Sequence, residues 1–258
     1  MILRWQLLRD APATPAWNMA LDEALLESAE AEGRCTLRLY AWDPPTISFG
    51  RHEPALRRYD RAAIAARGLA TVRRPTGGRA VWHHREVTYS VTAPTAAFGS
   101  LRASYHAIHA MLAAALQRLG AGVMLAADRP AAGVGAGACF ASAAGGEVMA
   151  MGGGKVVGSA QVRAGGAFLQ HGSILLVAEQ DVVAGVTLGD ADPPSATGIA
   201  ELVEARLASW DAVADAVAAE AGRRWQVPAA LAAPGQPLRV RAVALAGRYA
   251  DEEWTWRR

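Results

Sequence analysis

LATVRRPTGGRAVWHHREVTYSVT, residues 69–92, is the most informative stretch of this 258-residue sequence. Three of its runs have the β-branched, alternating character of strands: 69–74, 79–83 and 86–92. Between the first two runs, Gly77-Gly78 supplies the positive backbone dihedrals that a tight turn needs. The stretch therefore predicts strands joined by short turns, as in an antiparallel or mixed sheet.

Helical patterns lie on both sides of these strands. Thr14 and Pro15 match an N-cap and a first helical residue, and Gly33 closes that pattern. Further strands are predicted at 2–8, 36–42, 46–50, 155–162 and 167–177, and further helices at about 60–67, 101–119, 198–208, 210–222 and 242–256. Hairpin-like groups of strands with helices between the groups predict an α+β fold, with a mixed or mostly antiparallel sheet flanked by helices. A doubly wound parallel sheet is disfavoured because regular βαβ alternation is missing.

Composition excludes several classes of protein. With 52% hydrophobic residues, 19% charged residues and a net charge of +2, the chain is not disordered and has enough apolar material for one core. No uncharged apolar run reaches the ~18 residues of a membrane span, and no basic stripe indicates nucleic-acid binding. The two cysteines form no disulfide framework. We expect one domain over residues 1–258, located in the cytoplasm.

Three arginines flank the glycine pair, in Arg73-Arg74-Pro75-Thr76-Gly77-Gly78-Arg79. Backbone N–H groups exposed by glycines, together with guanidinium groups, favour a site for a phosphate or another anionic group. The spacing matches neither a Walker loop nor a dinucleotide fingerprint. A plain hairpin with Gly-Gly at its tip remains the structural alternative.

A second and a third motif follow in GKVVGSAQVR (154–163) and LQHGSIL (169–175). Strand alternation places Lys155, Val157 and Ser159 on one face. Lys155 is the single lysine among 26 basic residues, and an ammonium, unlike a guanidinium, exchanges its proton when desolvated. His171 alone is as well explained by a structural role.

Cysteine and histidine placement adds one candidate nucleophile and no metal site. Cys139 lies in a glycine-rich segment, where reactive residues are common, although a free cysteine is often a small buried hydrophobe. Cys35, inside an apolar run, fits that structural role. His83 and His84 are adjacent and would point to opposite faces of a strand, and no spacing resembles a zinc site, so no metal is expected.

Together, these motifs resemble the biotin/lipoate protein ligase superfamily and, within it, the LipM-type octanoyltransferases. The resemblance rests on RRPTGGRAVWHH (73–84), EVTYSV (86–91), ACF (138–140), GKVVGSAQVR (154–163) and LQHGSI (169–174). It covers roughly residues 30–245 and implies the catalytic-domain fold of that superfamily, with the predicted helix over 242–256 packed on it. The family usually has His-Asp where this chain has His83-His84.

The resemblance also implies residue roles. Cys139 matches the acyl-thioester nucleophile, and Lys155 matches the lysine that favours its thiolate. The segments that match the lining of the acyl and carrier-arm pocket contain Arg73, Arg74, Thr76, Gly77, Gly78, Arg79, His83, Gly158, Ser159, Ala160, Gln161, His171 and Gly172.

The implied activity is octanoyl transfer in lipoate biosynthesis. An acyl carrier protein would donate the octanoyl group to Cys139, and a lysine of a lipoyl carrier, such as glycine-cleavage H protein or a 2-oxoacid dehydrogenase lipoyl domain, would accept it. Thioester exchange is nearly isoenergetic and amide formation is downhill, so no cofactor and no ATP are expected. Surface arginines would steer the acidic carriers, although exposed arginines are usually just solvated: Arg57, Arg58, Arg61, Arg67 and Arg102.

Two alternatives stay open. An ATP-dependent lipoate–protein ligase of the same fold would need ATP and Mg²⁺, would use free lipoate, and would tolerate Cys139→Ser. A non-catalytic acyl- or carrier-binding protein on this scaffold would not require the Cys139 and Lys155 that the chain retains.

Overall fold

The first helix, α1 (Pro15–Glu32), begins and ends where the sequence indicates. The Thr14 side chain accepts a hydrogen bond from the Trp17 backbone N–H, and Gly33 ends the helix in the left-handed region at φ +66°. Asparagine, methionine, leucine and aspartate all occur among its buried residues. These observations come from a computed structural model, which describes residues 4–127, 145–189, 194–229 and 233–257.

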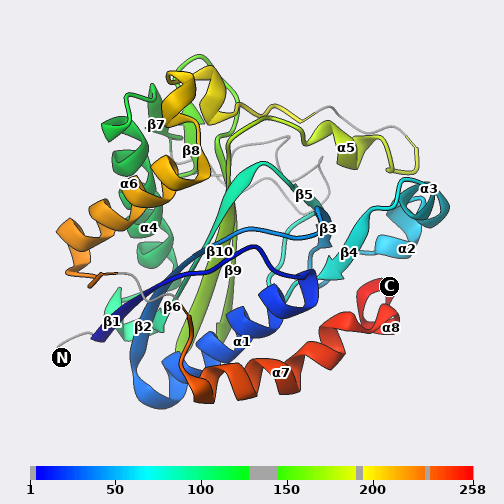
Figure 1. Cartoon of the computed structure of the whole chain (residues 1–258), viewed down its shortest axis with the longest axis horizontal. Coiled ribbons are helices and arrows are strands. Elements are labelled where there is room, and N and C mark those ends of the chain that lie inside the picture. The colour runs from blue at the N-terminus through cyan, green and yellow to red at the C-terminus, as the bar shows by residue number, and fades with distance from the viewer. Residues whose placement is uncertain (1–3, 128–144, 190–193, 230–232, 258) are drawn as a thin grey trace.

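Within these residues, five strands form the main sheet, which crosses the centre of the molecule (Figure 1). Their order is β1 (Arg4–Arg9), β2 (Arg34–Tyr40), β6 (Glu86–Pro94), β10 (Ala167–Leu175) and β9 (Val157–Ala164). The β1–β2 pair is parallel and the other three pairs are antiparallel. The mixed, mostly antiparallel sheet with flanking helices confirms the predicted α+β fold.

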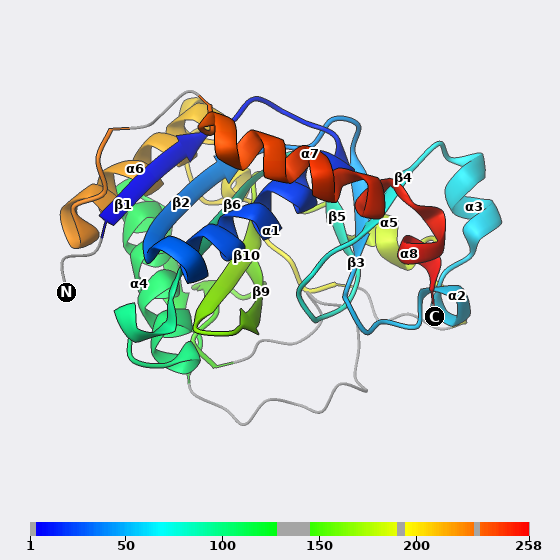
Figure 2. The same ribbon diagram turned by 90° about the horizontal axis from the view of Figure 1, so that it is seen from below.

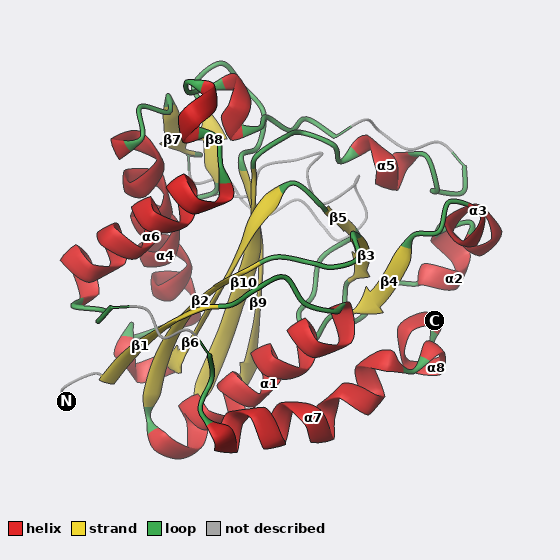
Figure 3. Cartoon of the chain, in the orientation of Figure 1, coloured by secondary structure: helices red, strands yellow, loops and turns green. Residues whose placement is uncertain are grey.

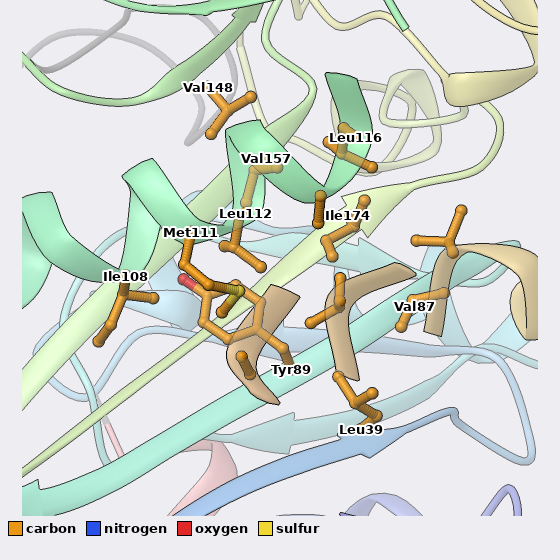
Figure 4. Packing of buried hydrophobic residues seen from close by; sticks show 14 of the residues in the cluster. Leu39, Val87, Tyr89, Ile108, Met111, Leu112, Leu116, Val148, Val157 and Ile174 are labelled. Carbon is orange, nitrogen blue, oxygen red and sulfur yellow. The ribbon is translucent and has the colours of Figure 1, made fainter. Parts of the chain in front are cut away.

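Helices cover both faces of this sheet (Figures 1 and 2). On one face, α4 (Leu101–Arg118) and α6 (Trp210–Trp225) share the largest core with β2, β6, β9 and β10. Leu39, Val87 and Tyr89 project from strands into this core, opposite Leu112 of α4 (Figure 4). On the other face, α1 packs on β2, β6 and β10, and α7 (Gln236–Ala250) packs against α1. Along the central strand β6, apolar residues of this core alternate with polar residues such as Ser90, which contacts Asp22 of α1 on the other face.

Smaller elements surround one end of the main sheet (Figure 3). The strands β4 (Ala70–Arg73), β3 (Thr46–Phe49) and β5 (Val81–His83) form a second sheet in that order. The short helices around it are α2 (Ala55–Arg58), α3 (Arg61–Ala66), α5 (Asp181–Ala184) and α8 (Glu252–Trp256). A separate pair, β7 (Val123–Leu125) and β8 (Val148–Ala150), packs beside α4. No described helix combines the length and hydropathy needed to cross a bilayer.

The chain differs from the sequence prediction in two helical regions. The predicted helix over 198–208 is instead two short 3-10 turns, Ile199–Glu201 and Ala205–Leu207. The backbone N–H of Ala200 bonds to the Leu176 carbonyl, and Gly198 lies so close to Leu176 and Val177 that a Cβ there would lie 2.7 Å from their backbone atoms. This tertiary contact replaces the helical hydrogen bonds.

The predicted helix over 242–256 is two helices rather than one. The first, α7, begins at Gln236, earlier than expected, and Asp251 stands between it and α8. Asp251 has an extended backbone and its side chain accepts a hydrogen bond from the Glu253 N–H, which caps α8. The break lets Trp256 turn onto Phe49 of the second sheet.

Candidate functional site

A cavity lies between the main sheet, the second sheet and α1, and it contains about 360 Å³ of empty space, part of it open to solvent. Its apolar lining comes from Met19, Tyr40, Trp42, Val81 and Ala160, and its polar lining from Ser48, Arg74, His83, Thr88, Ser159, His171 and Ser173. Gly158 and Gly172 complete the lining. A mostly apolar cleft with a few convergent polar groups is typical of a small-molecule site.

The turn that contains the glycine pair is built around the Arg74 guanidinium. Arg74 donates hydrogen bonds to the backbone carbonyls of Ser48, Gly77 and Arg79, at 2.9, 2.8 and 2.7 Å. Gly78 adopts φ +86°, and its carbonyl approaches Gly50 so closely that a Cβ at Gly50 would lie 1.8 Å away. Backbone approach therefore explains Gly50, the positive φ explains Gly78, and nothing in the described part of the structure explains Gly77. The role of Arg74 is to hold the turn.

A buried carboxylate organises the floor of the cavity. Asp22 of α1 accepts hydrogen bonds from Arg38, Tyr40, Ser90 and His171, at 2.8 to 2.9 Å. Burial alone would raise the pKa of Asp22, but the hydrogen bond from His171 and the charge of Arg38 outweigh it and lower that pKa. Asp22 is therefore the anion of a buried ion pair with Arg38.

His171 is held between two partners. Its Nδ1 lies 2.9 Å from Asp22 Oδ2, and its Nε2 lies 2.6 Å from Thr76 Oγ1. Burial lowers the pKa of His171, and Asp22 offsets this only in part, so the ring is neutral near pH 7. Nδ1 then donates to Asp22 and Nε2 accepts from Thr76, which fixes both side chains at the cavity wall.

His83 and His84 do point to opposite faces, as the sequence predicts. His83 is buried, with Nε2 2.7 Å from Ser48 Oγ and Nδ1 2.8 Å from Glu86 Oε1, and it stacks on Trp42. His84 is exposed and pairs with Glu179. Only His83 therefore belongs to the cavity.

Lys155 precedes β9 and lies outside the cavity lining. It is 2% exposed, and its Nζ lies 2.6 Å from Oε1 of the equally buried Glu147. The same carboxylate oxygen accepts a hydrogen bond from Tyr105 of α4, at 3.3 Å. Lys155 and Glu147 thus form a buried ion pair next to α4.

A chain of side chains connects this ion pair to the cavity. The Tyr105 ring lies edge-on to His109, with centroids 4.1 Å apart, and His109 Nε2 is 2.8 Å from Ser159 Oγ. Ser159 lines the cavity. Burial, aided by the charge of Lys155, lowers the pKa of His109 to about 3, so His109 is neutral. Lys155 and Ser159 thus both face α4, as strand alternation predicts.

Gln161 and Gln170 of the two motifs form hydrogen bonds that connect β9 and β10 to α4 and β6. Gln161 donates hydrogen bonds to Gln170 Oε1, Ser104 Oγ and the Leu101 carbonyl. Gln170 in turn donates to the Tyr89 hydroxyl, which lies 2.6 Å from Ser159 Oγ. Gln161 therefore faces away from the cavity and has a structural role.

Comparison with known proteins places this arrangement in a family. A family model described as "Lipoyl protein ligase A/B catalytic domain" matches residues 14–221. The chain belongs to this family. The ligase A/B match confirms the resemblance on which the site residues were predicted.

Curated relatives of this protein agree with the family assignment. "Octanoyltransferase LipM" of Moorella thermoacetica is 46% identical over 183 residues, which cover 69% of this chain and 67% of the relative. The protein of the same name from Kyrpidia tusciae is 37% identical over 278 residues, which cover 98% of this chain and 99% of the relative. Among solved structures, a lipoate-protein ligase A bound with ATP shares the fold, with a TM-score of 0.80, 21% identity and 99% coverage of each chain.

The cavity described above brings together about half of the predicted site residues. Those that line it are Arg74, His83, Gly158, Ser159, Ala160, His171 and Gly172, and Thr76 contacts His171. Those that do not are Arg73, Gly77, Gly78, Arg79, Gln161 and Lys155. Arg73 is buried and donates to the backbone carbonyls of Gly50, Glu53 and Thr255, so it ties the second sheet to α8. Cys139 lies outside the described residues.

Five polar residues around the candidate site were not predicted from the sequence: Asp22, Arg38, Tyr105, His109 and Glu147. Asp22 carried a usable signal, because it lies three residues after Met19 and four before Leu26, on the apolar stripe of α1. Glu147 carried none, since nothing in its local pattern indicates burial beside Lys155.

Gly172 explains a small residue in the third motif and gives a testable prediction. A Cβ at Gly172 would lie 2.3 Å from the Gly158 carbonyl oxygen and 2.9 Å from Tyr89 Cε1. We expect Gly172→Ala to force these strands apart and to lower the free energy of unfolding by about 1–3 kcal/mol. Chemical denaturation measures this change. Gly166→Ala, in the turn of the same hairpin and with no atom within 4 Å, is the control and should be nearly neutral.

Proposed function

We propose that this protein transfers an octanoyl group from acyl carrier protein to a lysine of a lipoyl carrier through a thioester at Cys139. The observation that carries the proposal is the end-to-end similarity to an octanoyltransferase LipM, at 98% coverage of this chain. Octanoyl transfer in lipoate biosynthesis is the activity that these relatives support. The buried Lys155, which is connected to Ser159 of the cavity through Glu147, Tyr105 and His109, supports the thioester route.

The cavity supplies a place for the acyl chain. Its apolar side chains, with Trp42 stacked on His83 as a rigid wall, suit a saturated hydrocarbon. Each buried methylene contributes about 0.8 kcal/mol, so an octanoyl chain gains on the order of 5 kcal/mol. This gain is large enough to discriminate against much shorter chains.

The first half-reaction exchanges one thioester for another. The Cys139 thiolate, supported by the Lys155 ammonium, attacks the carbonyl carbon of the carrier-bound octanoyl group. A new carbon–sulfur bond forms, the bond to the carrier sulfur breaks, and Lys155 gives a proton to the leaving thiolate. The products are the octanoyl enzyme, a free carrier thiol and a neutral Lys155 amine.

The second half-reaction restores the resting state. The amine of the acceptor lysine attacks the octanoyl thioester, and the proton that it loses passes to the neutral Lys155 amine. The amide bond forms, the bond to Cys139 breaks, and the thiolate–ammonium pair returns. No proton, electron or nucleotide is left over, so the cycle needs no ATP.

The carriers and the compartment belong to this proposal too. Members of the family act on lipoyl carrier proteins, and we infer that glycine-cleavage H protein or a 2-oxoacid dehydrogenase lipoyl domain is the acceptor. Exposed arginines, among them Arg57, Arg61 and Arg67, suit an acidic partner. A reducing cytoplasm would keep the Cys139 thiol free. Cys35 does not compete as a nucleophile, because burial raises the pKa of its thiol to about 11.

Intact-mass spectrometry tests the proposal. The protein is mixed with octanoyl acyl carrier protein without nucleotide, and we expect a gain of one octanoyl group that hydroxylamine removes. Cys139→Ala should show no gain, whereas Cys35→Ala should behave as the wild type. Transfer of free lipoate that requires ATP and Mg²⁺, with no octanoyl enzyme, would instead establish the ligase alternative.

A further inference from the structure

Glu147 is a buried carboxylate to which the two half-reactions give no role. Its side chain is 4% exposed and that of Lys155 is 3% exposed, and their charged atoms lie 2.6 Å apart. Two charges removed from water are tolerated only when they pair in good geometry. The carboxylate therefore compensates the one charge on which the proposed chemistry depends.

Glu147 is itself held by the long helix α4. The Tyr105 hydroxyl donates to the oxygen that Lys155 contacts, and the Tyr105 ring packs against the neutral His109. His106 of the same helix lies against Gly146, close enough that a Cβ at Gly146 would be 2.6 Å from its Nδ1. Among the described residues, Glu147 and Tyr105 of α4 therefore hold Lys155 in place.

We propose that Glu147 is a positioning residue that holds the Lys155 ammonium in place for acyl transfer. The inference rests on the proposed function. Without the carboxylate, the buried Lys155 side chain loses an ion-pair partner that holds it. Its amine is also released from a position that α4 fixes, and a displacement of about 1 Å costs on the order of 100-fold in rate.

The test compares Glu147→Gln and Glu147→Asp with the wild type in octanoyl transfer. We expect Glu147→Gln to lower kcat by about 100-fold while KM for the octanoyl carrier changes less than threefold. Glu147→Asp keeps the charge one methylene further away and should recover at least tenfold of the lost kcat.

Glu220→Gln is a matched control, because Glu220 is an equally buried, ion-paired glutamate on α6, bonded to Arg118, Arg223 and Arg224. It should lower stability and leave kcat within threefold of the wild-type value. A Glu147→Gln variant with the wild-type kcat would overturn this inference alone. Absence of an octanoyl enzyme in the wild type would overturn the proposed function and this inference with it.

Discussion

Lys155→Arg is expected to lower the rate of octanoyl transfer by about 10²–10⁴-fold. The guanidinium keeps the positive charge beside Glu147 but exchanges no proton near neutral pH, so it supports a thiolate and neither donates to the leaving carrier nor accepts from the attacking amine. Single-turnover measurements of both half-reactions give the size of the loss.

Two further measurements separate the effect of the positive charge at position 155 from the effect of proton exchange by Lys155. The rate of Cys139 alkylation by iodoacetamide reports the thiolate, and in Lys155→Arg it should stay within tenfold of the wild type. Lys155→Met removes the charge and should lower both alkylation and transfer. If Lys155→Arg transfers octanoyl groups at the wild-type rate, proton exchange by Lys155 plays no part in the reaction.

Asp22→Asn should produce the largest loss of stability. It removes the carboxylate that pairs with the fully buried Arg38 and accepts from Tyr40, Ser90 and His171. Breaking a buried ion pair by removing one partner costs about 3–5 kcal/mol, and Asp10, which also pairs with Arg38, places this loss near the lower end. Urea denaturation measures it.

The same substitution should change how stability depends on pH. The folded pKa of Asp22 lies below its unfolded value, so Asp22 stabilises the fold above about pH 4 and this contribution is lost as the pH falls through the folded pKa. Asp22→Asn should therefore flatten the acid side of the stability curve. Glu23→Gln is the control on the same helix, because its ion pair with Arg248 is partly exposed and should contribute less than about 1 kcal/mol. An equal effect of both substitutions would contradict the role of Asp22.

Much of the fold could be predicted because the signals were local. The Thr14 cap and the left-handed Gly33 define α1, and β-branched alternation defines β6. The two helical regions that differ from the prediction are those whose backbone conformation depends on contacts with residues far away in the sequence. Gly198 packs on the end of β10, and Arg73 binds the carbonyls of α8, so both segments follow contacts that lie far away in sequence.

The candidate site was predictable to a smaller extent. A motif names residues and does not say which way they turn: Arg74 faces the cavity turn, whereas its neighbour Arg73 faces α8. Strand alternation succeeded for Lys155 and Ser159 because the period of a strand is fixed. The predicted pocket role of Gln161 came from the motif and not from alternation, and its side chain contacts Leu101 and Ser104 of α4 instead of lining the cavity.

By itself, the sequence determined most of the longer helices and strands, the family, and the lysine on which the chemistry is proposed to depend, because caps, strand period and motif residues are local properties of the chain. The short elements α2, α5, β7 and β8 were not predicted. Only the tertiary structure decided that Asp22 pairs with Arg38 and Glu147 with Lys155. Burial makes an unpaired charge costly, so each buried ion needs a partner, and the partner is chosen by proximity in space rather than along the chain.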